Sequence, residues 1–226
     1  MISNKKYNNF WDSSYKRFEN NLKYPNEEIV KFVNKYILKE KFNKKKLTFL
    51  DLGCGNGRNT KYILENRFNV VGIDLSKVAI NNTRKLLKKS KFNPSRFKLI
   101  NVSSDNFKYE ADSFDYIISD STLDSMPVNE FNKTLKMIYN TIKPSGLIYL
   151  NLINIKNITH KGKFLNKYDF LIKSKHENNT IQSYFDRKRI NESFKQFKIL
   201  ENYEIIKIKK NKLLEARFHL ILKKIK

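Results

Sequence analysis

The chain has 226 residues, enough for one domain with a full hydrophobic core, and 40% of them are hydrophobic and 13% aromatic, as in globular proteins. It has no apolar run of roughly 18 residues that would predict a membrane span, and its polar start does not resemble a signal peptide. A single cysteine, Cys54, excludes an internal disulfide, and three dispersed histidines predict no metal cluster, so we expect a cytoplasmic protein.

The net charge of +24 is a strong compositional signal, because 46 lysines and arginines face only 22 acidic residues. A field this positive attracts anions, which include nucleic acid, an acidic membrane surface and a phosphorylated small molecule. The lysines are dispersed along the chain rather than concentrated in one patch. A solvated basic surface, in a chain rich in Lys and Asn, is therefore the alternative interpretation.

Two helices are predicted ahead of a sheet. The first covers about 7–20 and places aromatic residues on one face at spacings of three and four: Tyr7, Phe10, Trp11, Tyr15 and Phe18. The second begins at Pro25, with acidic residues in its first turn. Strands and helices then follow at 47–52, 58–66, 69–73, 76–90, 96–102, 114–119, 128–142 and 146–153. This alternation predicts an α/β fold with a parallel, doubly wound sheet. Ser76 is the predicted N-cap of the helix over 76–90.

The pattern changes after residue 153. Residues 154–185 lack clean periodicity and are predicted to form an irregular insertion with a short hairpin. A helix over 186–194 and strands over 197–208 and 213–223 close the sheet. No linker or repeat marks a second domain, so we expect one domain made of four regions. These are an N-terminal helical lid (1–45), a cofactor-binding core (46–153), a substrate-side insertion (154–185) and a C-terminal helix with strands (186–226).

The sequence from Asp51 to Gly57 follows the pattern D-x-G-x-G-x-G directly after the first strand. Arg58 stands where the dinucleotide fingerprint would have its last glycine, and no Walker lysine is present. Glycines let a ligand approach the main chain closely. Asp51 would repel a pyrophosphate but suits an amino group, and Asp74, ending the second strand, can accept both hydroxyls of a ribose. Together they favour a ligand with a ribose and an ammonium but no phosphate.

These motifs resemble the class I S-adenosylmethionine-dependent methyltransferases. The sequences 113–119 and 142–147 are similar to the family's fourth strand and to the turn before its fifth strand. The resemblance implies a Rossmann-like, seven-stranded, mostly parallel sheet with an antiparallel last strand, helices on both faces and an N-terminal helical lid. It also implies S-adenosylmethionine as cofactor, with S-adenosylhomocysteine as product. The cofactor residues that it implies are Trp11, Tyr15, Asp51, Gly53, Cys54, Gly55, Gly57, Arg58, Asp74, Leu75, Ser103, Ser104 and Asp120.

Two of these positions carry alternatives. The family's adenine-binding acid falls on Val102, so Ser103, Ser104 or Asp105 would have to replace it, and Asp105 is equally interpretable as a turn residue. Cys54 is best explained as a small residue that fits the turn.

The N-terminal stretch Phe10-Trp11-x-x-x-Tyr15 resembles the opening of the tellurite-resistance-type, small-molecule branch of the family. Trp11 or Tyr15 could cover the sulfonium, because an aromatic face attracts a cation. The alternative is hydrophobic packing of the same side chains onto the sheet.

The sequence 119–126 follows the strand that borders the transferred methyl in this family. It lacks the N/D-P-P-Y/F motif of base N-methyltransferases, and this half of the chain lacks the catalytic cysteine of RNA cytosine enzymes. An oxygen acceptor would need a base, for which Asp124, Asp120 and His160 are the candidates. Helix capping by the two aspartates and a surface-loop position for His160 are the alternatives.

We therefore predict methyl transfer to a small, anionic acceptor, for example a phosphorylated or nucleotide-linked sugar in surface-glycan synthesis. The alternative is an RNA methyltransferase that uses the basic surface, and a third is a cofactor-binding protein without catalysis. The expected assembly is a monomer or a homodimer.

Overall fold

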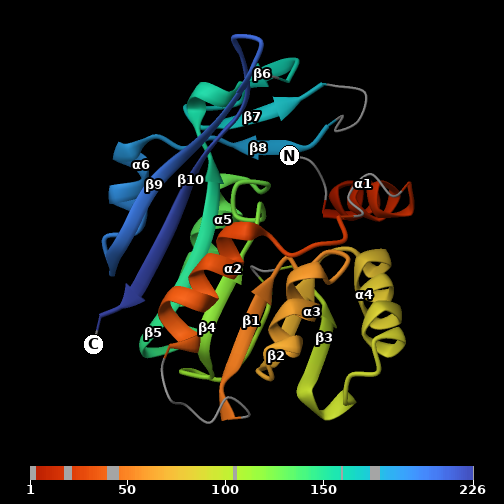
Figure 1. Cartoon of the computed structure of the whole chain (residues 1–226). Coiled ribbons are helices and arrows are strands. Elements are labelled where there is room, and N and C mark those ends of the chain that lie inside the picture. The colour runs from red at the N-terminus through yellow and green to blue at the C-terminus, as the bar shows by residue number, and fades with distance from the viewer. Residues whose placement is uncertain are drawn as a thin grey trace.

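The computed structural model describes residues 4–17, 22–39, 46–103, 106–158, 160–173 and 179–225, and a seven-stranded sheet forms its centre (Figure 1). The strands lie in the order β3-β2-β1-β4-β5-β10-β9. Strands β1 to β5 pair in parallel, whereas β10 is antiparallel to β5 and to β9. The predicted Rossmann-like fold with an antiparallel last strand is confirmed. The strands are β1 (Thr48–Leu52), β2 (Asn69–Asp74), β3 (Phe97–Asn101), β4 (Phe114–Ser119), β5 (Ile142–Ile153), β9 (Phe197–Lys209) and β10 (Lys212–Lys224).

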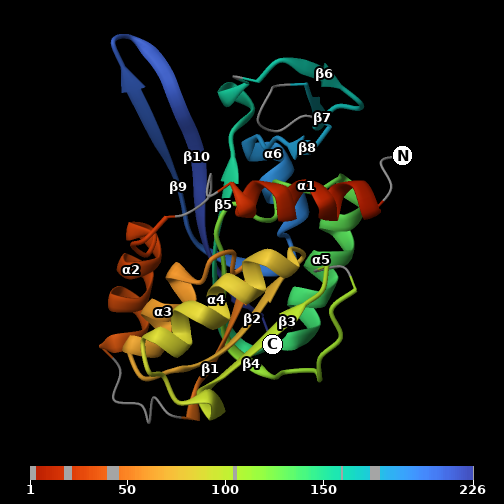
Figure 2. The same cartoon turned by 90° about the vertical axis from the view of Figure 1, so that its right-hand side faces the viewer.

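Helices cover both faces of this sheet, as predicted (Figures 1 and 2). On one face, α2 (Glu27–Val33) with the π-helical turn η1 (Asn34–Leu38), α3 (Arg58–Glu65) and α4 (Lys77–Lys89) share an apolar cluster with the strands. On the other face, α5 (Val128–Thr141) and α6 (Arg187–Ser193) share a second one. Ser76 caps α4 as predicted, because its hydroxyl oxygen accepts a hydrogen bond from the Ala79 amide at 3.1 Å.

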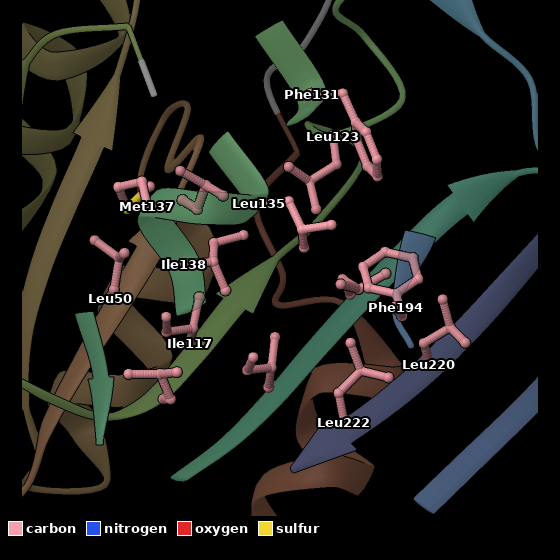
Figure 3. Packing of buried hydrophobic residues seen from close by; sticks show 14 of the residues in the cluster. Leu50, Ile117, Leu123, Phe131, Leu135, Met137, Ile138, Phe194, Leu220 and Leu222 are labelled. Atoms are coloured by element: carbon pink, nitrogen blue, oxygen red, sulfur yellow. The ribbon is translucent and has the colours of Figure 1, made fainter. Parts of the chain in front are cut away.

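The core explains why β1 has apolar residues at successive positions. Leu50 faces the cluster under α5, while its neighbour Phe49 faces the cluster on the opposite side, and both are fully buried. A strand that is buried on both faces needs apolar residues at successive positions. Figure 3 shows Ile138 of α5 and Leu222 of β10 in the same packed cluster as Leu50. This packing on both faces holds β1 in place, and it therefore also sets the position of the glycine turn that follows β1.

The region 154–185 is more regular than predicted. It contains the short helix η4 (Ile155–Asn157) and a three-stranded antiparallel sheet, formed by β6 (Gly162–Phe164), β7 (Asp169–Ile172) and β8 (Ile181–Ser183). These strands are three or four residues long, too short for alternation of polar and apolar residues to identify them. Phe170 and Ile172 of β7 form a small cluster with Tyr184 and with Ile153 at the end of β5, so this sheet is a layer beyond the end of β5.

The helix α1 (Asn4–Lys16) lies across the end of α4, apart from α2 (Figure 2). Asp12 of α1 binds the start of α4, because its carboxylate accepts hydrogen bonds from the Ser76 hydroxyl (2.5 Å) and the Val78 amide (3.1 Å). By contrast, α2 packs onto the sheet through Ile29 and Phe32. Within the described part of the predicted lid, Trp11, Tyr15 and Leu22 line the cavity at the end of the sheet. Among the described residues we find no helix with the length and hydropathy to cross a membrane.

Candidate functional site

A cavity of about 330 Å³ lies at the carboxyl ends of β1, β2 and β4. This is the edge at which open α/β sheets bind ligands. Its walls come from α1, the glycine turn after β1, the loop between β4 and α5, and single residues of β8 and β10. The predicted cofactor residues on these walls are Trp11, Tyr15, Gly53, Cys54, Gly55, Arg58, Asp74, Leu75, Ser103 and Asp120.

The glycine turn is held tightly against its neighbours. The amides of Gly53 and Cys54 both donate to the Ile73 carbonyl at 2.9 Å, which anchors the turn to β2. Gly53 has φ +75°, and a Cβ there would lie 2.0 Å from the Thr122 hydroxyl. Gly55 has φ +53°, and a Cβ there would lie 2.8 Å from the Tyr15 hydroxyl. Only glycine combines these conformations with this closeness, so the backbone itself forms the cavity wall.

Asp74 connects the glycine turn to the start of α4. One carboxylate oxygen accepts from the Gly55 amide at 2.9 Å and the other from the Ser76 amide at 2.8 Å. Burial raises the pKa of Asp74 to about 6, against the opposing effect of these two hydrogen bonds. Each oxygen of a carboxylate has a second lone pair, so Asp74 can also accept two ribose hydroxyls. The residues of this edge therefore fit a nucleoside.

Two of the predicted cofactor residues lie behind the cavity wall. Asp51 is buried and accepts a hydrogen bond from the Thr60 hydroxyl at 2.6 Å, which ties β1 to α3. Burial raises the pKa of Asp51 to about 7. Gly57 is the N-cap of α3, where a Cβ would meet Thr83. Both residues hold the turn in place from behind, and Ser104 lies outside the described residues.

Tyr15 and Trp11 bring α1 over the glycine turn. Both line the cavity, and the Trp11 ring packs edge-to-face on Phe10 at 5.3 Å. Burial, with Asp74 as the next largest cause, raises the pKa of Tyr15 well above its ordinary value, so its phenol stays protonated. The helix thus supplies an aromatic wall at the place where the sequence predicted one.

Asp120 is the centre of a polar network at the end of β4. One oxygen accepts from the side-chain amides of Asn26 (2.9 Å) and Asn151 (2.7 Å). The other accepts from Arg58 (2.5 Å) and from the Asn59 side chain (3.3 Å). Four donors use about all the lone pairs of a carboxylate. Asp120 therefore lines the cavity as a fixed acceptor that joins α2, α3 and β5.

Asp124 and Arg217 form a buried ion pair beside this network. Asp124 is fully buried, and one of its oxygens accepts from Arg217 Nη1 at 2.6 Å and from the Ile153 amide at 2.8 Å. Burial raises the pKa of Asp124, although the arginine opposes the shift. Arg217 lines the cavity, whereas Asp124 lies behind it, and His160, just before β6, is not among the lining residues.

The sequence alone did not indicate the residues that complete the cavity. Gln182 of β8 and Arg217 of β10 reach it from more than 50 residues beyond the β4–α5 loop, and Glu130 comes from the first turn of α5. Arg217 is placed by the register of β10, in which it pairs with Ile153 at the end of β5. A weak signal existed for Asn151, which binds Asp120 next to the cavity, because it lies near the end of a parallel strand at the ligand-binding edge.

The charged side chains on the cavity wall are largely compensated. Arg58 is paired with Asp120, and Arg217 with both Asp124 and Glu215. Asp74 and Glu130 add two further carboxylates. Among the described residues, the excess of positive charge therefore lies on the outer surface and not in the cavity.

Comparison with known proteins identifies the family. A family model described as a methyltransferase domain matches residues 43–215. The chain belongs to this family. Membership confirms the predicted resemblance and the enzyme class, with S-adenosylmethionine as the methyl donor. No curated protein matches the chain in sequence.

Solved methyltransferase structures share the fold at low sequence identity. An S-adenosylmethionine-dependent methyltransferase from Methanosarcina mazei has a TM-score of 0.68 at 19% identity, over 84% of this chain and 98% of its own. The 1,6-didemethyltoxoflavin-N1-methyltransferase of Burkholderia thailandensis, solved with 1,6-didemethyltoxoflavin and S-adenosylhomocysteine, has a TM-score of 0.64 at 14% identity, over 100% of this chain and 92% of its own. TehB from Haemophilus influenzae has a TM-score of 0.65 at 15% identity, over 93% of this chain and 67% of its own.

Proposed function

We propose that this methyltransferase acts on a small-molecule acceptor in the cytoplasm. The cavity carries the proposal, because α1 closes it on one side and an acceptor would have to enter it beside the cofactor. The Burkholderia thailandensis enzyme of similar fold, solved with 1,6-didemethyltoxoflavin bound, supports a small-molecule acceptor. Monomeric and homodimeric forms are both compatible with the proposal.

The residues at the cofactor end of the cavity would hold the methyl donor in place. When bound, S-adenosylmethionine supplies a methyl group that its sulfonium has already activated. Asp74 would hold the ribose hydroxyls, and the backbone of Gly53 to Gly55 would form the floor. Trp11 and Tyr15 of α1 would exclude water from above. Because an activated methyl needs mainly correct placement of the acceptor, these fixed walls are the principal contribution of the protein.

For an oxygen acceptor, a base is also needed, and we propose Glu130 for this task. Of the three bases predicted from the sequence, Asp120 alone lines the cavity, and its lone pairs are already used by four donors. Glu130 lines the wall formed by α5. With an oxygen acceptor, a Glu130→Gln variant should lose about 100-fold or more in kcat and keep its affinity for S-adenosylhomocysteine. Unchanged kcat would contradict this assignment.

The anionic character of the acceptor rests on the outer surface, whose net charge would steer anions toward the protein. We expect kcat/KM for phosphorylated or nucleotide-linked sugars to fall severalfold when salt is raised from about 0.05 M to about 0.5 M, because screening shortens the reach of surface charges. A neutral acceptor of similar size is the control. Turnover of anionic acceptors that does not respond to salt would exclude steering.

The activity test is the release of S-adenosylhomocysteine from S-adenosylmethionine in the presence of fractionated small metabolites and, separately, of bulk RNA. Release that follows a small-metabolite fraction supports the proposal. Methylation of RNA, together with tight and salt-dependent RNA binding, would instead support the RNA methyltransferase. Cofactor binding without any methylated acceptor would support a binding protein without catalysis.

A further inference from the structure

The hairpin of β9 and β10 extends past the edge of the central sheet. Arg217 of β10 pairs with Ile153, the last residue of β5, and the Asn154 amide still donates to the Ala216 carbonyl at 2.9 Å. From Glu215 to Lys212, β10 pairs in the sheet with β9 alone. The ladder between β9 and β10 continues to the pair of Lys209 with Lys212. The four residues of β10 beyond Ala216 cover about 13 Å. The hairpin therefore protrudes at the carboxyl edge of the sheet, where the cavity also lies (Figures 1 and 2).

The two sides of this protruding part differ in character. Cross-strand partners share a side of a hairpin. One side is apolar, with Ile206 opposite Ala216 and Ile208 opposite Leu213, and the other is charged, with Lys207 opposite Glu215 and Lys209 opposite Lys212. The apolar side continues the side of β10 on which Phe218 packs into the core. At the tip, however, apolar side chains are in water: on this side 47% of Ile206 and 65% of Ile208 are exposed. Leu214, at the register shift between Leu213 and Glu215, is 54% exposed.

The tip is also strongly basic. Its lysines are Lys207, Lys209, Lys210 and Lys212, and its carboxylate, Glu215, is paired with Lys207. Exposed aliphatic side chains gain free energy when they are buried, and the hydrated lysines attract anions. The tip therefore suits a partner that offers anions and an apolar layer beside them.

The neighbouring layer adds to the same end of the molecule. The small sheet of β6, β7 and β8 lies at this end in both views (Figures 1 and 2). Its first strand and the segments beside it carry further exposed apolar side chains, at Ile158, Phe164 and Leu165. Most of the exposed large apolar residues in the described part of the chain thus belong to the insertion and the hairpin.

We propose that this end of the protein, led by the hairpin tip (residues 205–215), docks onto the surface of an anionic lipid bilayer. The lysines would contact lipid phosphates, and Ile206, Ile208 and Leu214 would enter the boundary between headgroups and acyl chains. Nucleic acid fits less well, because it would leave the aliphatic side chains in water. Residues 205–215 also contain no aromatic ring on which a base could stack. Docking would bring the cavity close to the bilayer surface, and it does not depend on the methyl-transfer proposal.

Vesicle cosedimentation at physiological salt tests this directly. The full-length protein should bind vesicles of phosphatidylcholine with about 30% phosphatidylglycerol, and bind pure phosphatidylcholine vesicles at least tenfold more weakly. Ile206→Ser/Ile208→Ser, which keeps the net charge, should weaken binding to the anionic vesicles by about tenfold. Lys209→Glu/Lys210→Glu/Lys212→Glu should weaken it by about 100-fold or more, since each lysine near the surface contributes roughly fivefold.

A matched control separates docking by the tip from diffuse attraction. Lys85→Glu/Lys88→Glu/Lys89→Glu makes the same change in charge on the exposed side of α4. This variant should bind anionic vesicles within about threefold of the unmodified protein, because charges farther from the bilayer than a Debye length act weakly. All variants should keep their affinity for S-adenosylhomocysteine, which verifies folding. The proposal is overturned if the unmodified protein does not bind anionic vesicles. It is equally overturned if the α4 variant loses as much as the lysine variant of the tip, or if the isoleucine variant binds normally.

Discussion

An Asp74→Asn variant is expected to bind S-adenosylhomocysteine about 100-fold more weakly than the unmodified protein, a loss of about 3 kcal/mol. Both oxygens of Asp74 accept hydrogen bonds from backbone amides, one from Gly55 and one from Ser76. An asparagine offers one acceptor oxygen, so its NH2 group would face one of these N–H donors. The glycine turn or the start of α4 must then shift, and the charge-assisted bonds to the ribose are lost at the same time.

Calorimetric titration with S-adenosylhomocysteine measures this loss, and Asp115→Asn is the matched control. Asp115 also accepts from a backbone amide, that of Thr48 at 2.9 Å, and it pairs with Lys143. It lies in β4 beside the amino end of β1, away from the cavity, so its variant should bind the ligand normally. Equal affinities of the Asp74 variant and the unmodified protein would refute the ribose-binding role.

The same residue predicts a pH dependence of binding. Burial raises the pKa of Asp74 to about 6, so the carboxylate starts to take up a proton at a mildly acidic pH. Since the ribose hydroxyls need the ionised form as acceptor, affinity should decrease as the pH falls through about 6. Asp51, with a pKa of about 7, also titrates in this range. The contribution of Asp74 is therefore the part of the pH dependence that disappears in Asp74→Asn.

The central fold and the donor half of the site were predictable because their signals are local. Asp51 to Gly57 and Asp74 lie at fixed short distances from the strands that they follow, and those strands are apolar on both faces. The acceptor half depends on contacts between distant segments. Arg217 reaches the cavity because β10 pairs with β5 in one particular register, and no feature of residues 212–224 alone specifies that register.

The role of a single carboxylate was equally hard to predict. In sequence, Asp120 and Asp124 differ little, since both follow β4 within five residues. In the structure, Asp120 receives four donors and lines the cavity, whereas Asp124 is fully buried against an arginine that lies 93 positions away. Their difference arises from the neighbours that α2, α3 and β10 bring to them, which only the folded chain reveals.

Arg217→Met is expected to reduce the free energy of unfolding by about 3–5 kcal/mol at pH 8, because it leaves the Asp124 carboxylate buried without a counter-charge. Asp124 is fully buried, and the Arg217 side chain is only 14% exposed, so water cannot replace the lost partner. The other oxygen of Asp124 has no hydrogen-bond partner among the described residues. Urea denaturation monitored by circular dichroism measures the loss. Arg84→Met, on the exposed side of α4, should change stability by no more than about 0.5 kcal/mol.

Two further measurements distinguish a buried charge from a simple loss of packing. Burial already raises the pKa of Asp124, so the folded protein binds a proton there more readily than the unfolded chain does. A group of this kind favours folding at low pH, and this advantage is lost as the pH rises through its folded-state pKa. The pKa of Asp124 must rise further once Arg217 is absent, so the destabilisation of Arg217→Met should be smaller at pH 5 than at pH 8.

The double variant is the second measurement. Arg217→Met/Asp124→Asn should be more stable than Arg217→Met alone at pH 8, since it removes the charge itself. An equal loss at both pH values, with no gain from the second substitution, would mean that Arg217 acts only through packing.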